Sequence, residues 1–197
     1  QKVKAVYDQR EYLSLDPQQL RLTEQTYKRF VRAGALLTPA QKEQLKKINE
    51  QLSRLGVQFG NNLLADNNAF TLVIDKQEDL AGVPASIQSA ANTEAVNRKM
   101  EGKWVFTLSK PSMIPFLSYS ERRDLREKLY KAYLERCNRG DSTDNKQIVN
   151  EIAKLRLEKA RLMGYPSYGA FALDDEMAQT PENAYALLDK LWQPSLE

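Results

Sequence analysis

The side chains of this 197-residue chain that could do chemistry are carboxylates, arginines, tyrosines and one cysteine, because the chain contains no histidine. That absence excludes the Ser-His-Asp and Cys-His arrangements, the His-Glu-x-x-His zinc motif and any histidine general base. Cys137 has no histidine partner to activate it, and a single cysteine cannot form an internal disulfide. Glycine-rich phosphate-binding loops are also missing.

Two acidic stretches are the candidates for metal binding or acid–base catalysis. Asp174, Asp175 and Glu176 form the densest cluster, which is more typical of a solvated link between helices than of a site. Residues 141–144 (DSTD) superficially resemble a calcium loop, but they lack the alternating ligands, the central glycine and the final glutamate. We therefore predict no catalytic, cofactor-binding or metal-binding residue in this chain.

Arginine and tyrosine side chains offer a second kind of site. Several arginines could grip a substrate carboxylate through forked hydrogen bonds, although their helical spacing favours pairing with neighbouring glutamates. These arginines are Arg122, Arg123, Arg136, Arg156 and Arg161. Tyr165 and Tyr168 flank a turn and could stack on a ligand, but packing of half-buried rings is the commoner use of such residues.

The charge pattern argues against nucleic acid and membrane partners. Charged residues make up 28% of the chain with a net charge of +3, and acidic and basic residues alternate, most clearly over residues 120–136. Alternating signs indicate a salt-bridged helix face, whereas nucleic-acid binding needs a patch of one sign. No apolar run approaches the length needed to span a bilayer.

Three sites repeat the same signal for the start of a helix, a capping side chain followed by proline: Asp16-Pro17, Thr38-Pro39 and Thr180-Pro181. They predict helices over 17–33, 39–66 and 181–193. The first of these should end at Gly34 in a left-handed cap.

The predicted helix 39–66 carries apolar residues spaced by three and four, which draws one stripe along it. This stripe consists of Leu45, Ile48, Leu52, Leu55, Phe59 and Leu63. Gly56 and Gly60 lie inside the helix, and we expect them to be tolerated because another helix approaches closely there.

Further helices are expected over 84–99, from Ser120, from Asp144 as the cap, and briefly from Ser167. Residues 69–74 and 104–108 are rich in β-branched and aromatic side chains and predict two strands, paired as a small antiparallel ribbon. The fold class is therefore mainly α, multi-helical with a two-stranded β ribbon. We expect one helical fragment over 1–197, with sub-parts 1–110 (helices and the β ribbon) and 111–197 (helical).

An ordered series of segments carries a family resemblance along nearly the whole chain. It includes 30–37 (FVRAGALL), 59–64 (FGNNLL), 104–108 (WVFTL) and 123–133 (RDLREKLYKAY). Together these segments strongly resemble the thimet oligopeptidase and peptidyl-dipeptidase family of zinc metallopeptidases. The stretches PFLSYS and TPEN favour the bacterial peptidyl-dipeptidase, or dipeptidyl carboxypeptidase, branch.

This resemblance implies two helical lobes around a channel that admits only short peptides. In the family, a His-Glu-x-x-His motif and a downstream Glu bind zinc, and the motif Glu is the general base. This chain has no such motif and resembles the region before it, so no catalytic or zinc residue transfers to any position here. The resemblance thus implies a non-catalytic channel-wall segment of a parent that removes dipeptides from peptide C-termini in the bacterial cytoplasm or periplasm. Zinc would belong to the parent, and the partners would be the rest of the parent and short peptides.

A different class of function is a free-standing helical interaction module without enzymatic activity, whose apolar stripe binds a partner helix. The last predicted helix runs to the end of the sequence without a C-cap, which favours a segment of a longer structure. Such a segment would expose apolar surface through which two copies could dimerise.

Overall fold

The computed structural model describes residues 2–196. Within them the chain forms two compact units, one made of residues 2–53 and 152–196 and the other of residues 54–151. The boundaries between these units follow residues 53 and 151.

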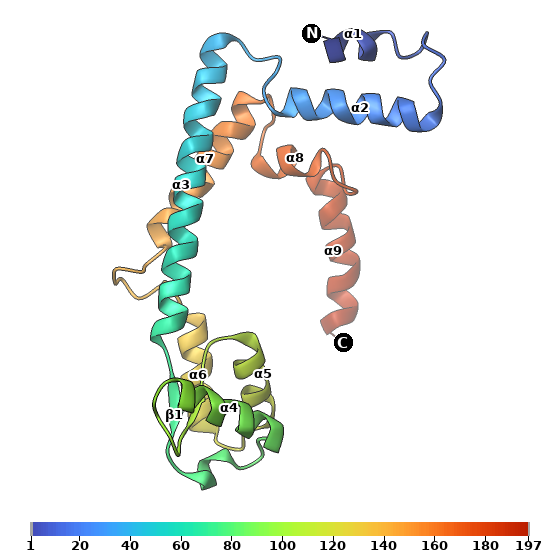
Figure 1. The fold of residues 1–197 in the computed structure, drawn as a ribbon. Helices are drawn as coiled ribbons and strands as arrows, with labels where there is room; N and C mark the ends of the chain where they lie inside the picture. The colour runs from blue at the N-terminus through green and yellow to red at the C-terminus, as the bar shows by residue number, and fades with distance from the viewer. Residues whose placement is uncertain (1, 197) are drawn as a thin grey trace. The chain divides into compact units, whose positions relative to one another are not determined.

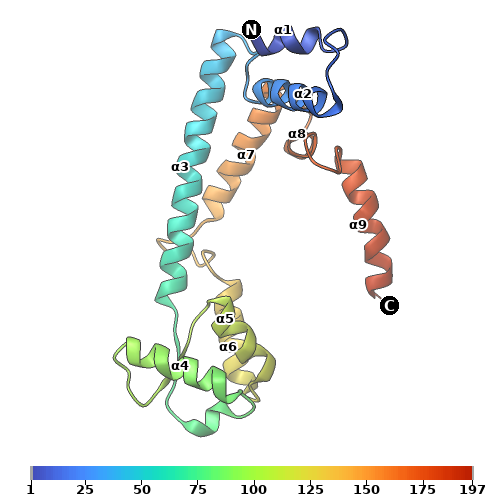
Figure 2. The same cartoon turned by 45° about the vertical axis from the view of Figure 1, so that its right-hand side comes forward.

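The elements divide between the units as follows (Figures 1 and 2). The first unit contains α1 (Lys2–Asp8), α2 (Pro17–Arg32), α8 (Tyr168–Leu173) and α9 (Pro181–Leu196). The second contains β1 (Leu72–Ile74), the 3-10 helix η1 (Gln77–Leu80), α4 (Ala85–Asn97), β2 (Trp104–Phe106), α5 (Lys110–Tyr119) and α6 (Arg123–Leu134). The helices α3 (Pro39–Ala69) and α7 (Lys146–Leu162) contribute residues to both units. The predicted fold class, mainly helical with one small two-stranded sheet, is confirmed.

The predicted helix starts form through side-chain caps. At α2, the Gln19 amide donates to Asp16 Oδ1 over 2.8 Å, and the Asp16 amide donates to Gln19 Oε1 over 3.1 Å. At α3, Thr38 and Gln41 exchange the same pair of hydrogen bonds, 3.0 and 3.3 Å long. Each capping box satisfies backbone N–H groups that the first turn of a helix leaves free, which explains why both helices begin at the proline.

The core of the second unit is built around the ribbon. Strands β1 and β2 pair antiparallel, as the sequence predicts, with Leu72 opposite Phe106. Both are shorter than the predicted 69–74 and 104–108, because α3 continues to Ala69 and β2 ends at Phe106. The Phe106 ring packs on Phe116 of α5 with centroids 4.4 Å apart, and Leu129 of α6 is fully buried. The remaining buried residues of this core are Ile74, Leu80, Val83, Ala91, Leu108 and Met113.

Two helices were not predicted, and two predicted caps act differently. The missed helices are α1 and α5; α5 contains Pro115, which normally breaks a helix. Ser120 does not cap α6. Its hydroxyl accepts the Arg122 amide over 3.2 Å, and the helix starts at Arg123. Likewise α7 begins after Asn145, although Asp144 Oδ1 still accepts the first helical amide, that of Lys146, over 2.9 Å.

The stripe predicted on α3 faces inward, with Leu45, Ile48 and Leu55 buried. The expectation for Gly56 and Gly60 was wrong. Both are exposed, and a Cβ atom at either position would meet no heavy atom of the described chain within 4 Å. No helix of the second unit packs against these two positions, so in the isolated chain the glycines lower the stability of α3.

We therefore expect Gly56→Ala and Gly60→Ala each to stabilise the isolated chain by about 1 kcal/mol, because alanine loses less backbone entropy in a helix. Urea unfolding followed by circular dichroism measures the change. Gly82→Ala is the matched opposite case: Gly82 has φ +80, and its Cβ would overlap the Tyr119 carbonyl oxygen. That variant should be destabilised. Loss of stability on substitution by alanine at Gly56 or Gly60 would contradict the exposed, uncrowded position of these glycines.

Candidate functional site

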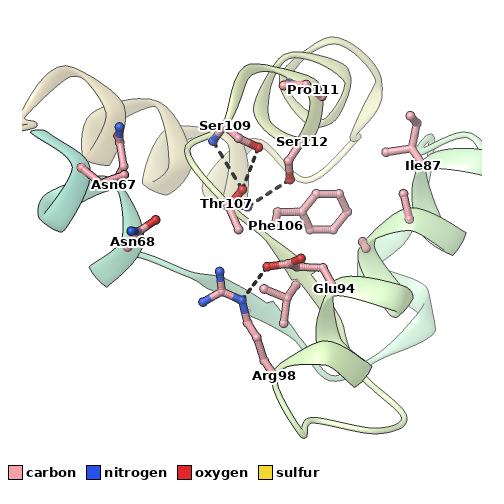
Figure 3. Close-up of a pocket in the computed structure, with 14 residues that line it drawn as sticks. Asn67, Asn68, Ile87, Glu94, Arg98, Phe106, Thr107, Ser109, Pro111 and Ser112 are labelled. Atoms are coloured by element: carbon pink, nitrogen blue, oxygen red, sulfur yellow. Dashed lines mark hydrogen bonds and ion pairs between the residues drawn. The ribbon is translucent and has the colours of Figure 1, made fainter.

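The candidate binding site is a pocket of about 530 Å³ in the second unit. The end of α3, the length of α4, strand β2 and the start of α5 surround it, and Figure 3 shows its lining. Its floor is apolar, formed by Ile87, Ala91, Val105 and Phe106. The pocket therefore combines a firmly packed base with side chains from four separate elements.

The polar groups around the pocket are amides and hydroxyls already ordered by one another (Figure 3). The Thr107 amide donates to Ser112 Oγ over 3.0 Å, and the Thr107 and Ser109 hydroxyls lie 3.0 Å apart. Asn67 and Asn68 add side-chain amides from α3. The chain has no histidine that could activate these hydroxyls, and the arrangement suits hydrogen bonding to a ligand.

The charged groups in the pocket neutralise each other. Arg98 Nε, at the residue that follows α4, donates to Glu94 Oε1 of α4 over 2.7 Å. No free cation or anion remains among the lining residues. A neutral polar ligand with apolar side groups would fit this lining better than a carboxylate or phosphate.

Cys137, the only thiol, belongs to a structural network of the second unit. It is buried with φ +52, and its amide donates to Asp66 Oδ2 over 2.6 Å. Burial, followed by the nearby charge of Asp66, raises the pKa of the Cys137 thiol. A protonated, buried thiol is a poor nucleophile.

Three further contacts fix the connection between α6 and α7. Arg139 pairs with Asp66, which is only 2% exposed. Buried Asn145 accepts from the Asn62 side chain over 2.9 Å and donates to the Phe59 carbonyl over 3.2 Å. These bonds tie the connection between α6 and α7 to the end of α3, and they assign the buried polar groups a structural role.

The sequence suggested that the acidic cluster 174–176 is a solvated link between helices. In the structure, two of its carboxylates are paired instead. In the first unit, Asp174 Oδ2 lies 3.3 Å from Lys28 Nζ and 3.2 Å from Arg32 Nη1, and it accepts the Tyr165 hydroxyl over 3.0 Å. Asp175 also pairs with Lys28 over 3.4 Å. The cluster therefore joins α2 to the turn after α8, which sequence spacing could not show.

This network shifts two titrating groups. Burial disfavours the Asp174 carboxylate, but hydrogen bonds from Tyr165 and Lys28 and the charges of Lys28 and Arg32 outweigh burial, so the pKa of Asp174 is lowered. Burial and the bond to Asp174 raise the pKa of Tyr165. A carboxylate of this kind contributes stability above its unfolded-state pKa and loses that contribution as the pH falls through its folded-state pKa.

We expect Asp174→Asn to be less stable than the wild type at neutral pH and to lose less stability as the pH falls from about 6 to about 3. Thermal unfolding across this range measures both effects. Glu176→Gln, which changes an exposed carboxylate two residues away, is the matched control and should keep the wild-type slope. Identical pH slopes for the wild type and Asp174→Asn would contradict the network.

The candidate arginines pair differently from the prediction. Arg122 binds Asp79 and Asp124, not a neighbouring glutamate. Arg136 stacks on the Tyr133 ring at 3.6 Å from its centroid, and Arg156 lies 5.1 Å from the Tyr168 ring. Among the described residues, Arg123 and Arg161 form no ion pair within 4 Å. These contacts engage Arg122, Arg136 and Arg156 separately and do not form a carboxylate-binding site within either unit.

Tyr165 and Tyr168 both pack against Phe171, with ring centroids 5.3 and 6.1 Å away.

In the loop 141–144, Asp141 Oδ1 accepts the Thr143 amide over 2.9 Å, and Asp144 Oδ2 accepts the Gly140 amide over 2.6 Å. These carboxylates are thus engaged by their own loop. Over residues 2–196, no three His, Cys, Asp or Glu side chains lie together as metal ligands would.

The sequence is similar to known peptidases. A sequence model of peptidase family M3 matches residues 116–197. The chain is 36% identical over 183 residues to the dipeptidyl carboxypeptidase of Escherichia coli, covering 93% of this chain and 27% of that protein. It is 36% identical over 194 residues to the chloroplastic/mitochondrial organellar oligopeptidase A of Arabidopsis thaliana, covering 95% of this chain and 24% of that protein.

A lower but still extensive similarity links the chain to oligopeptidase A of Haemophilus influenzae, at 31% identity over 191 residues, with 95% of this chain and 28% of that protein covered. The chain spans between 24% and 28% of the length of these three curated relatives. The aligned region thus accounts for nearly all of this chain and for a minor part of each peptidase.

Proposed function

Since this chain belongs by sequence to peptidase family M3, we propose that it is a non-catalytic, channel-wall segment of a zinc-dependent oligopeptidase. One observation carries the proposal: over 90% of the chain aligns with peptidases, yet the chain has no histidine to form a His-Glu-x-x-His site. Catalysis and zinc then belong to another part of the parent polypeptide.

The physical role of such a segment is steric. Packed helices around an enclosed reaction centre admit flexible short peptides and exclude folded proteins. The pocket of the second unit suits this role, because its amides and hydroxyls can hydrogen-bond to any peptide backbone while its charges are internally paired. Its apolar floor would take side chains of varied shape.

We further propose that the parent is a peptidyl-dipeptidase, which removes dipeptides from peptide C-termini, on the basis of the stretches PFLSYS and TPEN. Overall identity does not separate the branches, because it is 36% both to a dipeptidyl carboxypeptidase and to an oligopeptidase A. A bacterial cytoplasmic or periplasmic location remains part of this proposal. Over residues 2–196, no helix has the length and apolarity required to cross a membrane.

The second candidate function is a helical interaction module without enzymatic activity. One observation favours it, the exposed apolar face of α9, where Leu188, Leu191 and Trp192 are each more than half exposed. A module would bind its partner from a separate polypeptide, whereas a peptidase segment would be covered by its own parent.

An assay of dipeptide release tests the proposed function. The isolated chain should release no dipeptide from an N-blocked oligopeptide, whereas the polypeptide encoded by its complete reading frame should release dipeptides until a zinc chelator is added. Added zinc should restore that activity. Chelator-sensitive hydrolysis by the isolated chain would overturn the non-catalytic role, and an inactive complete polypeptide would overturn the peptidase assignment.

A further inference from the structure

Helix α9 has one apolar face that the rest of the first unit leaves uncovered. Five large residues occupy it, each between 57% and 65% exposed: Tyr185, Leu187, Leu188, Leu191 and Trp192. The helix has no buried residue, and within the first unit it packs against α8. Figure 2 shows α9 extending away from α8. An amphipathic helix of this length is marginal in water unless its apolar face is packed.

The two faces of α9 are cleanly separated. At 100° per residue, the five apolar side chains cover roughly 160° of the helix circumference. The opposite side carries Glu182, Asp189, Lys190 and Gln193, all exposed. Large exposed apolar patches rimmed by polar residues mark interaction surfaces in soluble proteins, so the face requires an occupant.

The chemistry of α9 narrows the choice of occupant. Helices that lie on membrane surfaces carry an excess of Lys and Arg on the polar face, whereas here Lys190 is accompanied by Glu182 and Asp189. A helix that pairs with one identical helix needs only a narrow seam with a 3.5-residue repeat. The wide face of α9 instead matches a helix that closes a multi-element protein core.

The similarity to peptidases indicates which core α9 would join. The region that matches peptidase family M3, residues 116–197, includes all of α9. Relatives that align with nearly this whole chain have more than two thirds of their length outside the aligned region. We propose that the apolar face of α9 docks on the core of that remaining part of the same peptidase polypeptide. This inference rests on the proposed function and adds to it the surface through which the segment joins the rest of the enzyme.

Two matched aspartate substitutions on α9 test the inference. Leu191→Asp places a charge on the apolar face, and Gln193→Asp places the same charge on the polar face. In the isolated chain, held at a concentration where light scattering shows a monomer, both variants should unfold at the wild-type temperature. In the complete polypeptide, Leu191→Asp should lower the unfolding temperature by roughly 5 °C or more and reduce peptide hydrolysis, while Gln193→Asp should change neither.

A fluorescence measurement keeps the test decisive if the complete Leu191→Asp variant fails to fold. Trp104→Phe leaves Trp192 as the only tryptophan of the isolated chain, and its emission should be that of an indole in water and readily quenched by iodide. Shielded, blue-shifted emission in the monomer would show that this chain covers its own helix and would overturn the inference. Equal behaviour of the two aspartate variants in an active complete polypeptide would overturn the inference alone. An inactive native polypeptide would instead overturn the proposed function.

Discussion

Phe116→Ala is expected to destabilise the second unit by about 3 to 5 kcal/mol, the usual cost of removing a buried aromatic ring. Phe116 is 0% exposed, and its ring packs directly on Phe106 of the ribbon. Its loss would leave a cavity between α5 and β2, which the fixed ribbon cannot easily close. Urea unfolding followed by circular dichroism of the isolated chain measures the change.

Ile114→Ala is the matched control, because Ile114 lies on the same helix and is 50% exposed. It should cost much less than Phe116→Ala. If Phe116→Ala prevents folding altogether, Phe116→Leu, which retains most of the buried volume, should give a measurable intermediate loss. Equal effects of Phe116→Ala and Ile114→Ala would contradict the position of α5 on the ribbon.

Asp66→Ala is expected to cost about 3 kcal/mol, because it removes the acceptor of a buried amide together with a charge partner. Asp66 is 2% exposed, accepts the Cys137 amide over 2.6 Å and pairs with Arg139. The Arg139 side chain is 39% exposed, so solvent screens the ion pair and the unsatisfied amide should contribute most of the loss.

The comparison variant for Asp66 is Glu127→Ala, which breaks an exposed pair with Lys131 one helical turn away. That change should leave the urea midpoint almost unaltered, since exposed pairs contribute little. Cys137 should in addition become more reactive toward a thiol reagent in Asp66→Ala, because the loop that buries it loses its anchor to α3. Unchanged stability and thiol reactivity would contradict the anchoring role of Asp66.

Local sequence signals predicted the parts of the fold that depend on neighbouring residues. Asp16-Pro17 and Thr38-Pro39 set helix starts because their caps are satisfied within four residues. The ribbon was predictable because its β-branched and aromatic content differs from the helices around it. Helix α5 was missed because Pro115, which lacks an amide donor, lies inside it, and the buried contacts of Phe116 override that local preference.

The polar networks could not be predicted, because their members are far apart in the chain. Asp66 meets Arg139 across 73 residues, and Lys28 meets Asp174 across 146. Neither pair has a signature in residue spacing. The pocket of the second unit is equally hidden from sequence patterns, since Asn67 and Ser112 both line it only when α3, α4 and α5 pack around β2. The absence of histidine, in contrast, could be read directly from the sequence and limits the chemistry of this chain.

The most direct test of the central claim is to determine the nucleotide sequence of the reading frame that encodes this chain and to extend it beyond Glu197. If the chain is a non-catalytic segment of an M3 peptidase, a His-Glu-x-x-His motif and a later zinc-binding glutamate should follow in the same frame. A stop codon directly after Glu197, with no such motif elsewhere in the frame, would contradict the claim. The interaction module would then be the better account of the exposed face of α9.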